Sequence, residues 1–152
     1  MRTFTFFGNK ALLELPKTAF LSSRRIPPEQ VLKCYDWAAS QRDAGTCVIS
    51  GFHSALEKDV LRFLLKDRQP LIVVLARRFY TRIPEAWNTA FDEGRLLIVS
   101  TSSAARASES TTRQRNRFIL DHADRVVLGS LTPGGDLDKL VSKVAANKLV
   151  LL

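Results

Sequence analysis

The sequence predicts an α/β fold: a three-layer, doubly wound and mainly parallel sheet. Short apolar runs alternate with helical patterns, and the connections between them are short. The runs are nearly continuous in apolar residues, as expected for strands buried on both faces of a parallel sheet. A third observation is that four runs end in small polar, glycine or basic residues, over 19–25, 47–54, 71–78 and 96–103.

The helical patterns between these runs complete the predicted alternation. They span 27–45, opened by Pro27-Pro28 and stopped by Gly45; 56–64; 84–92, closed by Gly94; about 113–122; and 137–145. Further strands are predicted at 125–129 and 148–152, with an edge strand at 3–7. With right-handed crossovers, this order gives one Rossmann-like domain over residues 1–152.

Composition and charge narrow the class of partner. The chain has 152 residues, enough for one domain with a core, and a formal net charge of +8. Such a charge favours nucleic acid, nucleotides or an anionic membrane surface, unless it is only a solvated basic surface. Cys34 and Cys47 are too few for a disulfide framework and are predicted to be buried. With no signal peptide and no membrane-length apolar run, we expect a cytoplasmic protein without a membrane partner.

Several familiar catalytic and cofactor motifs are absent from the sequence. It has no Gly-x-x-x-x-Gly-Lys-Ser/Thr loop, no Gly-x-Gly-x-x-Gly after the first main strand and no Gly-x-Ser-x-Gly elbow. The second main strand ends in Ser50-Gly51, not in an acidic residue for a ribose hydroxyl. Two histidines, His53 and His122, are too few for a histidine-based metal cage. We therefore expect no cofactor and no metal.

The strand ends predict a site for phosphate. In an open parallel sheet, ligands bind outside the carboxyl ends of the strands, where helix starts favour anions. His53 has a second interpretation as a packing or capping residue. The candidate ligand residues at these strand ends carry hydroxyl, glycine or basic groups: Ser22, Ser23, Arg24, Ser50, Gly51, His53, Ser54, Gly134 and Gly135.

A cluster of arginines is the other concentrated signal. Arg113, Arg115 and Arg117 fall within five residues at a predicted helix start, where the helix dipole favours acids. Arginines at that position are electrostatically unfavourable, which suggests that a bound anion compensates for them. A solvated basic face would also explain the pattern. The preceding Ser/Thr-rich stretch, 101–112, is predicted to be a mobile loop over the crevice, or simply a solvated connector.

These motifs, in this order, resemble the Rossmann-like core of the DprA/Smf DNA-processing proteins. Ser22-Ser23-Arg24 stands at that family's Gly-Ser-Arg, and Val48-Ile49-Ser50-Gly51 resembles its next strand and Ser-Gly. Arg115-Asn116-Arg117 resembles its Arg-Asn-Arg motif, the most specific element. The segments 72–76 and 124–128 resemble its other strands. Pro133-Gly134-Gly135 resembles a turn of the related LOG-type phosphoribohydrolases.

The resemblance implies a Rossmann-like fold that binds single-stranded DNA in a basic pocket, forms a homodimer and helps to load a recombinase. It implies that Arg24, Arg115 and Arg117 contact DNA or phosphate, with Ser23, Ser50 and Gly51 as loop donors. One departure is the segment 52–57, where the family carries an arginine and Gly-Ile-Asp. The family's flanking helical and winged-helix domains have no counterpart in these 152 residues, so the resemblance covers the core only.

The resulting hypothesis is a binding module, not an enzyme, for single-stranded DNA or a phosphate-bearing nucleotide ligand. Bases would stack on Phe52, Phe79 or Tyr80. The alternative is a LOG-like nucleoside monophosphate phosphoribohydrolase that cleaves an N-glycosidic bond, with Glu57 and Asp136 as catalytic carboxylates. A third interpretation is a scaffold whose basic face docks an acidic protein.

Overall fold

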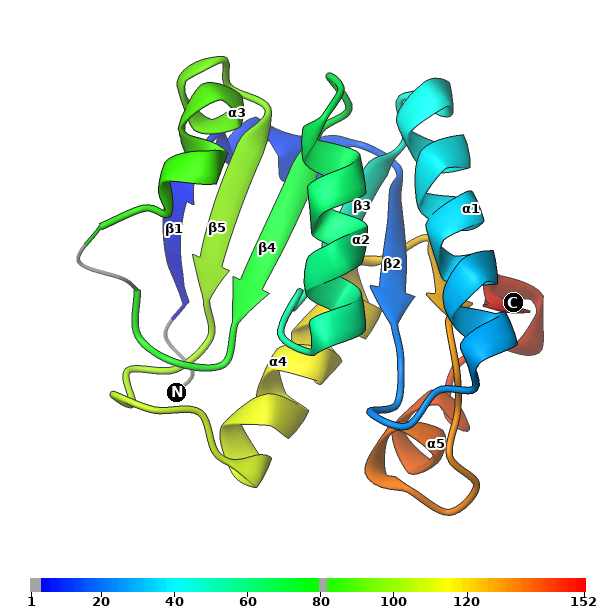
Figure 1. Ribbon diagram of the computed structural model, residues 1–152. Coiled ribbons are helices and arrows are strands. Elements are labelled where there is room, and N and C mark those ends of the chain that lie inside the picture. Colours follow the sequence, from blue (N-terminus) through cyan, green and yellow to red (C-terminus); the bar gives the residue numbers. More distant parts are fainter. Residues whose placement is uncertain (1–3, 80–81) are drawn as a thin grey trace.

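The computed structural model describes residues 4–79 and 82–152. Within them, seven strands form one sheet in the order β1-β5-β4-β3-β2-β6-β7 (Figure 1). All neighbouring strands run parallel except β1, which is antiparallel to β5. The predicted doubly wound, mainly parallel sheet is confirmed. The strands are β1 (Thr5–Gly8), β2 (Lys17–Leu21), β3 (Cys47–Ser50), β4 (Leu71–Leu75), β5 (Leu96–Ser100), β6 (Arg125–Leu128) and β7 (Leu149–Leu151).

Helices cover both faces of this sheet. The α-helices are α1 (Pro28–Ala44), α2 (Ala55–Leu65), α3 (Asn88–Asp92), α4 (Glu109–His122) and α5 (Asp136–Val141), and the 3-10 helices are η1 (Lys10–Glu14), η2 (Glu85–Trp87) and η3 (Ala146–Lys148). Residues of α1, α2 and α3 belong to one hydrophobic cluster, and those of η1, α4 and α5 to another. Strands β2, β3, β4, β5 and β6 lie between these clusters and are buried on both sides, which explains their continuous apolar runs.

The order of the strands reverses at β2. From β2 the chain adds β3, β4 and β5 on one side of it, whereas β6 and β7 lie on its other side. The connection from β5 to β6 therefore passes over the opposite face, through α4. Such a reversal leaves a crevice outside the carboxyl ends of the central strands, which is the usual ligand position in this class of fold.

Local signals place the starts and stops of α1 and α2. Pro28 occupies the first position of α1, where its missing N–H leaves no intrahelical bond unmade. Gly45 ends α1 with a φ of 71°, and its N–H donates to the carbonyls of Arg42 and Gln41. Ser54 and Glu57 form a capping box at the start of α2. These boundaries agree with the predicted ones.

Helix α4 begins earlier than predicted, and this corrects an argument about its charges. Ser108 caps the helix. Its hydroxyl accepts from the Thr111 N–H, and the Thr111 hydroxyl accepts from the Ser108 N–H. Residues 109–112, predicted as loop, therefore form the first turn, which carries Glu109. The arginines from Arg113 onward follow that turn, so they do not oppose the helix dipole as expected. Only the part of the predicted loop before Ser108 is irregular.

Other predicted boundaries and faces differ in smaller ways. Helix α5 ends at Val141, not at residue 145, because Ser142 bonds back to the Lys139 carbonyl and the chain turns toward β7. The 3-10 helix η1 was not predicted; the Asn9 side chain caps it. Leu32 of α1 is 66% exposed, because Cys34 and Ala38 form the buried face of that helix.

Both cysteine thiols are core groups, as predicted. Cys34 and Cys47 are buried, and burial raises the pKa of each thiol to about 11. At neutral pH both therefore remain protonated and behave as small apolar side chains.

Replacing Phe20 tests the packing of the face covered by α1. Phe20 lies in β2, is fully buried and stacks on Trp37 with ring centroids 5.0 Å apart. We expect Phe20→Ala to lower the free energy of unfolding by about 3–5 kcal/mol, because it leaves a cavity. Leu32→Ala is the control and should change it by less than about 0.5 kcal/mol. Urea denaturation measures both; equal losses would contradict the burial of these side chains.

Candidate functional site

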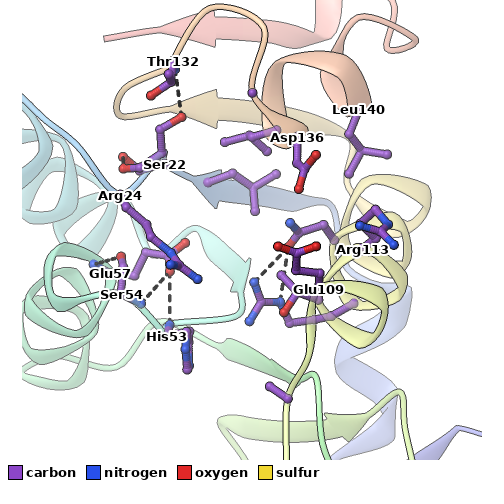
Figure 2. A pocket seen from close by; sticks show the side chains of 18 of the residues that line it. Ser22, Arg24, His53, Ser54, Glu57, Glu109, Arg113, Thr132, Asp136 and Leu140 are labelled. Carbon is purple, nitrogen blue, oxygen red and sulfur yellow. Dashed lines mark hydrogen bonds between the residues drawn. The ribbon is translucent and has the colours of Figure 1, made fainter.

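A cavity of about 520 Å³ lies at the carboxyl ends of the central strands, where the strand order reverses. Residues that follow β2, β3 and β6 line it, together with the start of α4 (Figure 2). In Figure 2, Arg24, His53 and Ser54 lie on one side and Glu109 and Arg113 on the facing side. The cavity is lined by Leu21, Ser22, Ser23, Arg24, His53, Ser54, Glu57, Ala107, Ser108, Glu109, Thr112, Arg113, Arg115, Asn116, Thr132, Gly135, Asp136, Leu137 and Leu140.

Most of the predicted ligand residues meet in this cavity. Those that line it are Ser22, Ser23, Arg24, His53, Ser54, Arg113, Arg115 and Gly135, together with Glu57 and Asp136 of the alternative hydrolase hypothesis. Those that do not line it are Ser50, Gly51, Arg117 and Gly134. The catalytic roles of Glu57 and Asp136 stay a prediction.

The loop after β2 is fixed to the loop after β6. The Ser23 N–H donates to the Ser130 carbonyl at 2.9 Å, and the Ser23 hydroxyl accepts from the Thr132 N–H at 2.9 Å. These bonds set the width of the cavity between the two loops. Arg24, which follows, is exposed and forms no hydrogen bond or ion pair with another described residue. Its guanidinium is therefore available to a ligand.

The loop after β3 turns sharply, and Ser50, one of the predicted ligand residues, holds that turn. The Ser50 hydroxyl is buried and accepts from the Phe52 N–H at 3.2 Å. Phe52 has a φ of 45°, a left-handed conformation that costs a non-glycine residue about 1–3 kcal/mol. Its ring is 4% exposed within the core, so the prediction that bases stack on Phe52 is wrong.

Phe79, the second predicted stacking residue, does not lie in the cavity wall described above. Phe79 stacks on Phe7, with ring centroids 3.6 Å apart, and takes no part in lining the cavity. Tyr80 falls outside the described residues.

Ser54 and Glu57 join the start of α2 to the cavity. The Glu57 carboxylate oxygen Oε1 accepts from the His53 N–H at 3.1 Å and from the Ser54 N–H at 3.0 Å. The Ser54 hydroxyl accepts from the Glu57 N–H in return. Glu57 is only 5% exposed, so a carboxylate is held inside the cavity wall. Both residues were predicted from the sequence as site residues, but their capping box was not predicted.

Arg115 forms the floor of the cavity on the α4 side. It is 7% exposed, and its Nε and Nη2 donate to the Asn116 side-chain oxygen at 3.2 and 3.1 Å. Its guanidinium packs against the backbone of Gly51, where an added Cβ would lie 2.7 Å from Arg115 Cζ. Gly51 therefore leaves room for this guanidinium, and its role as a ligand donor stays a prediction.

Helical geometry explains why Arg115 and Arg117 differ. Arg115 lies three and four residues before Phe118 and Ile119, so all three share the buried stripe of α4. Arg117 is two residues, about 200°, away from Arg115, and it is exposed. The spacing of Phe118 and Ile119 in the sequence was the signal that separates the two arginines.

Burial shapes the electrostatics of the cavity. Desolvation lowers the pKa of the Arg115 guanidinium from its ordinary value, and Glu57 opposes that shift. The guanidinium remains charged, because its ordinary pKa is so high. Desolvation also lowers the pKa of His53; Arg115, Lys58 and Arg24 lower it further, while Glu57 raises it. His53 is therefore a neutral imidazole at pH 7.

The cavity is not uniformly basic, which modifies the prediction of a basic crevice. The described lining includes the arginines Arg24, Arg113 and Arg115 but also the acids Glu57, Glu109 and Asp136. Glu109 was missed in the sequence because α4 was predicted to begin four residues late, and Asn116 was named only as the middle residue of the Arg-Asn-Arg motif. Once the helix starts at Glu109, its cavity-facing stripe recurs at i, i+3, i+4 and i+7: Glu109, Thr112, Arg113 and Asn116.

The glycines after β6 have separate roles. Gly134 has a φ of 75°, which favours glycine, and its N–H donates to the Asp138 carboxylate at 2.8 Å. Gly135 caps α5 and lines the cavity. Gly134 thus shapes the turn, and only Gly135 reaches the cavity.

A second cavity of about 490 Å³ adjoins the first. The two share Arg24, His53 and Ser54. The walls of the second cavity are mainly apolar and come from Ile26, Val31, Tyr35, Ala55 and Leu56, with Asp59 at its edge. The Tyr35 hydroxyl donates to the Asp59 carboxylate at 2.8 Å, which fixes the ring in the wall.

Among the described residues, no group of three or more His, Cys, Asp or Glu side chains could hold a metal ion. No helix in the same residues is long and apolar enough to cross a membrane.

The same architecture occurs in solved structures. DNA processing protein A (DprA) of Helicobacter pylori superposes with a TM-score of 0.72 at 19% identity, over 97% of this chain and 70% of that one. For DprA of Streptococcus pneumoniae the TM-score is 0.65 at 19% identity, over 97% of this chain and 62% of that one. A molybdenum cofactor binding protein of Rippkaea orientalis superposes with a TM-score of 0.61 at 12% identity, over 90% of this chain and 75% of that one.

These likenesses confirm the fold that the resemblance to DprA implies, a Rossmann-like core. No protein-family model and no curated protein matches the sequence.

The contact between Gly51 and Arg115 can be tested by a double-mutant cycle. We expect Gly51→Ala to lower the free energy of unfolding by about 1–3 kcal/mol, because its Cβ would overlap the guanidinium. In the Arg115→Ala background the space is vacated, so most of that cost should disappear. Urea denaturation of the four proteins gives the coupling. The cost should persist in the Arg117→Ala background; a cost independent of Arg115 would contradict the contact.

Proposed function

We propose that this chain binds single-stranded DNA, with a phosphate of the strand in the first cavity and a neighbouring base in the second. The observation that carries the proposal is Arg115. It is a buried cation that lines the cavity, and no ion pair within 4.0 Å joins it to another described residue.

A buried charge without a counter-charge raises the free energy of the folded protein, and a bound anion would offset that cost. Removing an ion from water costs several kcal/mol unless a counter-charge and hydrogen bonds replace the lost hydration. Arg115 uses Nε and Nη2 on the Asn116 amide oxygen, a neutral acceptor, and Nη1 forms no hydrogen bond with the described residues. A phosphate oxygen is the complementary acceptor for guanidinium, and exposed Arg24 and Arg113 supply further cationic donors around the cavity.

The second cavity supplies the surface that a base needs. Its mainly apolar walls and the Tyr35 ring suit an unstacked nucleobase, and a base on an aromatic side chain gains about 1–3 kcal/mol. Because both cavities share Arg24, His53 and Ser54, a phosphate in one and a base in the other would belong to adjoining parts of one strand.

The structural neighbours agree with this assignment. DprA of Helicobacter pylori, which shares this fold over 97% of the present chain, binds single-stranded DNA. The chain spans 62% of DprA from Streptococcus pneumoniae, so dimerisation and recombinase loading by this chain stay predictions.

Arg115 and Arg117 form a matched pair for testing the proposal. We expect Arg115→Gln to weaken binding of a short oligodeoxynucleotide by about 10- to 100-fold, because it removes charged hydrogen bonds to phosphate. Arg117→Gln, on the same helix but outside the cavity, should weaken binding only slightly. Fluorescence anisotropy across a salt series measures both, and Arg115→Gln should reduce the slope of log K against log salt by about one.

Circular dichroism and thermal unfolding of the Arg115→Gln protein control for misfolding. If the folded Arg115→Gln and Arg117→Gln proteins bound the oligonucleotide equally well, the cavity would not be the phosphate site. Loss of binding in the Arg117→Gln protein but not in the Arg115→Gln protein would place the strand on the exposed face of α4 instead.

His53 gives the binding a pH dependence of known sign. Its pKa lies below the ordinary value in the free protein, and a bound phosphate would raise it. Binding then takes up a proton, so affinity should rise as the pH falls from about 8 to 5, by about tenfold. A phosphodiester does not titrate in this range. His53→Gln should flatten the profile measured by anisotropy, and an unchanged profile in that variant would exclude His53 as the titrating group.

A further inference from the structure

Two opposite buried charges line the first cavity without touching each other. Glu57 is 5% exposed and Arg115 is 7% exposed, and both form part of the same cavity wall. Each influences the other electrostatically, yet no nitrogen of Arg115 lies within 4.0 Å of an oxygen of Glu57. Both charges have therefore lost water without gaining each other as partners.

The carboxylate has one oxygen to spare. Oε1 of Glu57 accepts from two backbone N–H groups, those of His53 and Ser54. Oε2 accepts no hydrogen bond from the described residues. His53 and Ser54 also line the second cavity, so these bonds hold the carboxylate where the two cavities meet. In the proposed placement, a group that lies between the phosphate and the base would lie near this carboxylate.

The group that fits a carboxylate is a hydrogen-bond donor. Within a nucleotide, the sugar lies between the phosphate and the base, and its free hydroxyl can donate to Oε2. A nucleotide inside a DNA strand has no free sugar hydroxyl, because its 3′ oxygen is esterified. Its second phosphate would meet Glu57, and Glu109 and Asp136 lie in the same cavity wall. Like charges in a poorly hydrated site repel strongly.

We propose that the cavity holds the 3′-terminal nucleotide of a single strand: its phosphate binds Arg115, and its 3′ hydroxyl donates to Glu57. This proposal rests on the proposed function and sharpens it from single-stranded DNA in general to strands with a free 3′ end. Recognition of a strand end would explain why the cavity contains both arginines and carboxylates. The arginines bind the last phosphate, and the carboxylates exclude a continuing chain.

Four DNA ligands of one sequence test the end recognition: a linear strand with a 3′ hydroxyl, the same strand with a 3′ dideoxynucleotide, the same strand with a 3′ phosphate, and a covalent circle. We expect the 3′ hydroxyl strand to bind at least about tenfold more tightly than each of the others, measured by competition in fluorescence anisotropy. Equal binding of the circle and the linear strand would overturn the proposal.

Glu57→Gln is the matched variant, because its amide oxygen can still accept from the His53 and Ser54 N–H groups. We expect the preference for a 3′ hydroxyl over a 3′ dideoxy end to fall below about twofold, and the 3′ phosphate strand to bind more tightly than it does to the unaltered protein. Thermal unfolding verifies that the variant is folded. A preference retained in full by folded Glu57→Gln would show that another group reads the strand end.

The outcomes separate this proposal from the one on which it rests. If the circle and the linear strand bind equally and Arg115→Gln weakens both, single-stranded DNA binding in the cavity stands and end recognition fails. If none of the four ligands binds, the proposed function itself fails. A deoxynucleoside 5′-monophosphate has the same phosphate and 3′ hydroxyl; tighter binding of that nucleotide than of the strand would assign the cavity to a free nucleotide and overturn the strand-end proposal.

Discussion

The central position of β2 constrains the rest of the structure. Because β3, β4 and β5 lie on one side of it and β6 and β7 on the other, the chain must use both faces of the sheet. Helix α2 starts from the β3 loop on one face, and α4 crosses on the opposite face before β6. The N-terminal ends of α2 and α4 meet outside the carboxyl ends of the strands, where ligands bind in open parallel sheets. The cavity is a consequence of this reversal.

The contact between Arg115 and Gly51 turns that space into a chemical site. It joins α4 to the loop after β3, two segments that the strand order brings together from distant parts of the chain. The tight turn at Ser50 and Phe52 exposes the backbone of Gly51 to the guanidinium, and only a residue without a Cβ leaves enough room. The buried guanidinium has a neutral amide as its partner, so the cavity retains the capacity to bind an anion.

Carboxylates beside the arginines change what the site can select. A uniformly basic surface attracts any polyanion and discriminates little among its parts. If the proposed function holds, a cavity with Glu57 in its wall would favour a ligand that has a hydrogen-bond donor beside its phosphate. The same carboxylate orders the start of α2 through its capping box, so recognition and local folding share one side chain. The two backbone hydrogen bonds that the carboxylate accepts offset part of the free-energy cost of burying it.

The sequence by itself determined the alternation of strands and helices, the parallel sheet and the loops that line its edge, because apolar periodicity, glycine stops and serine caps act over a few residues. It also selected Arg24, His53 and Arg115. Tertiary structure decided which members of each cluster line the cavity: Arg115 turns inward and Arg117 outward, and Gly51 leaves room for the Arg115 guanidinium. It also placed Glu57 and Arg115 in one wall without contact. The spacing of Arg115 from Phe118 and Ile119 indicates which arginine turns inward. The contact of its guanidinium with the loop after β3 joins segments more than sixty residues apart, and no local pattern encodes it.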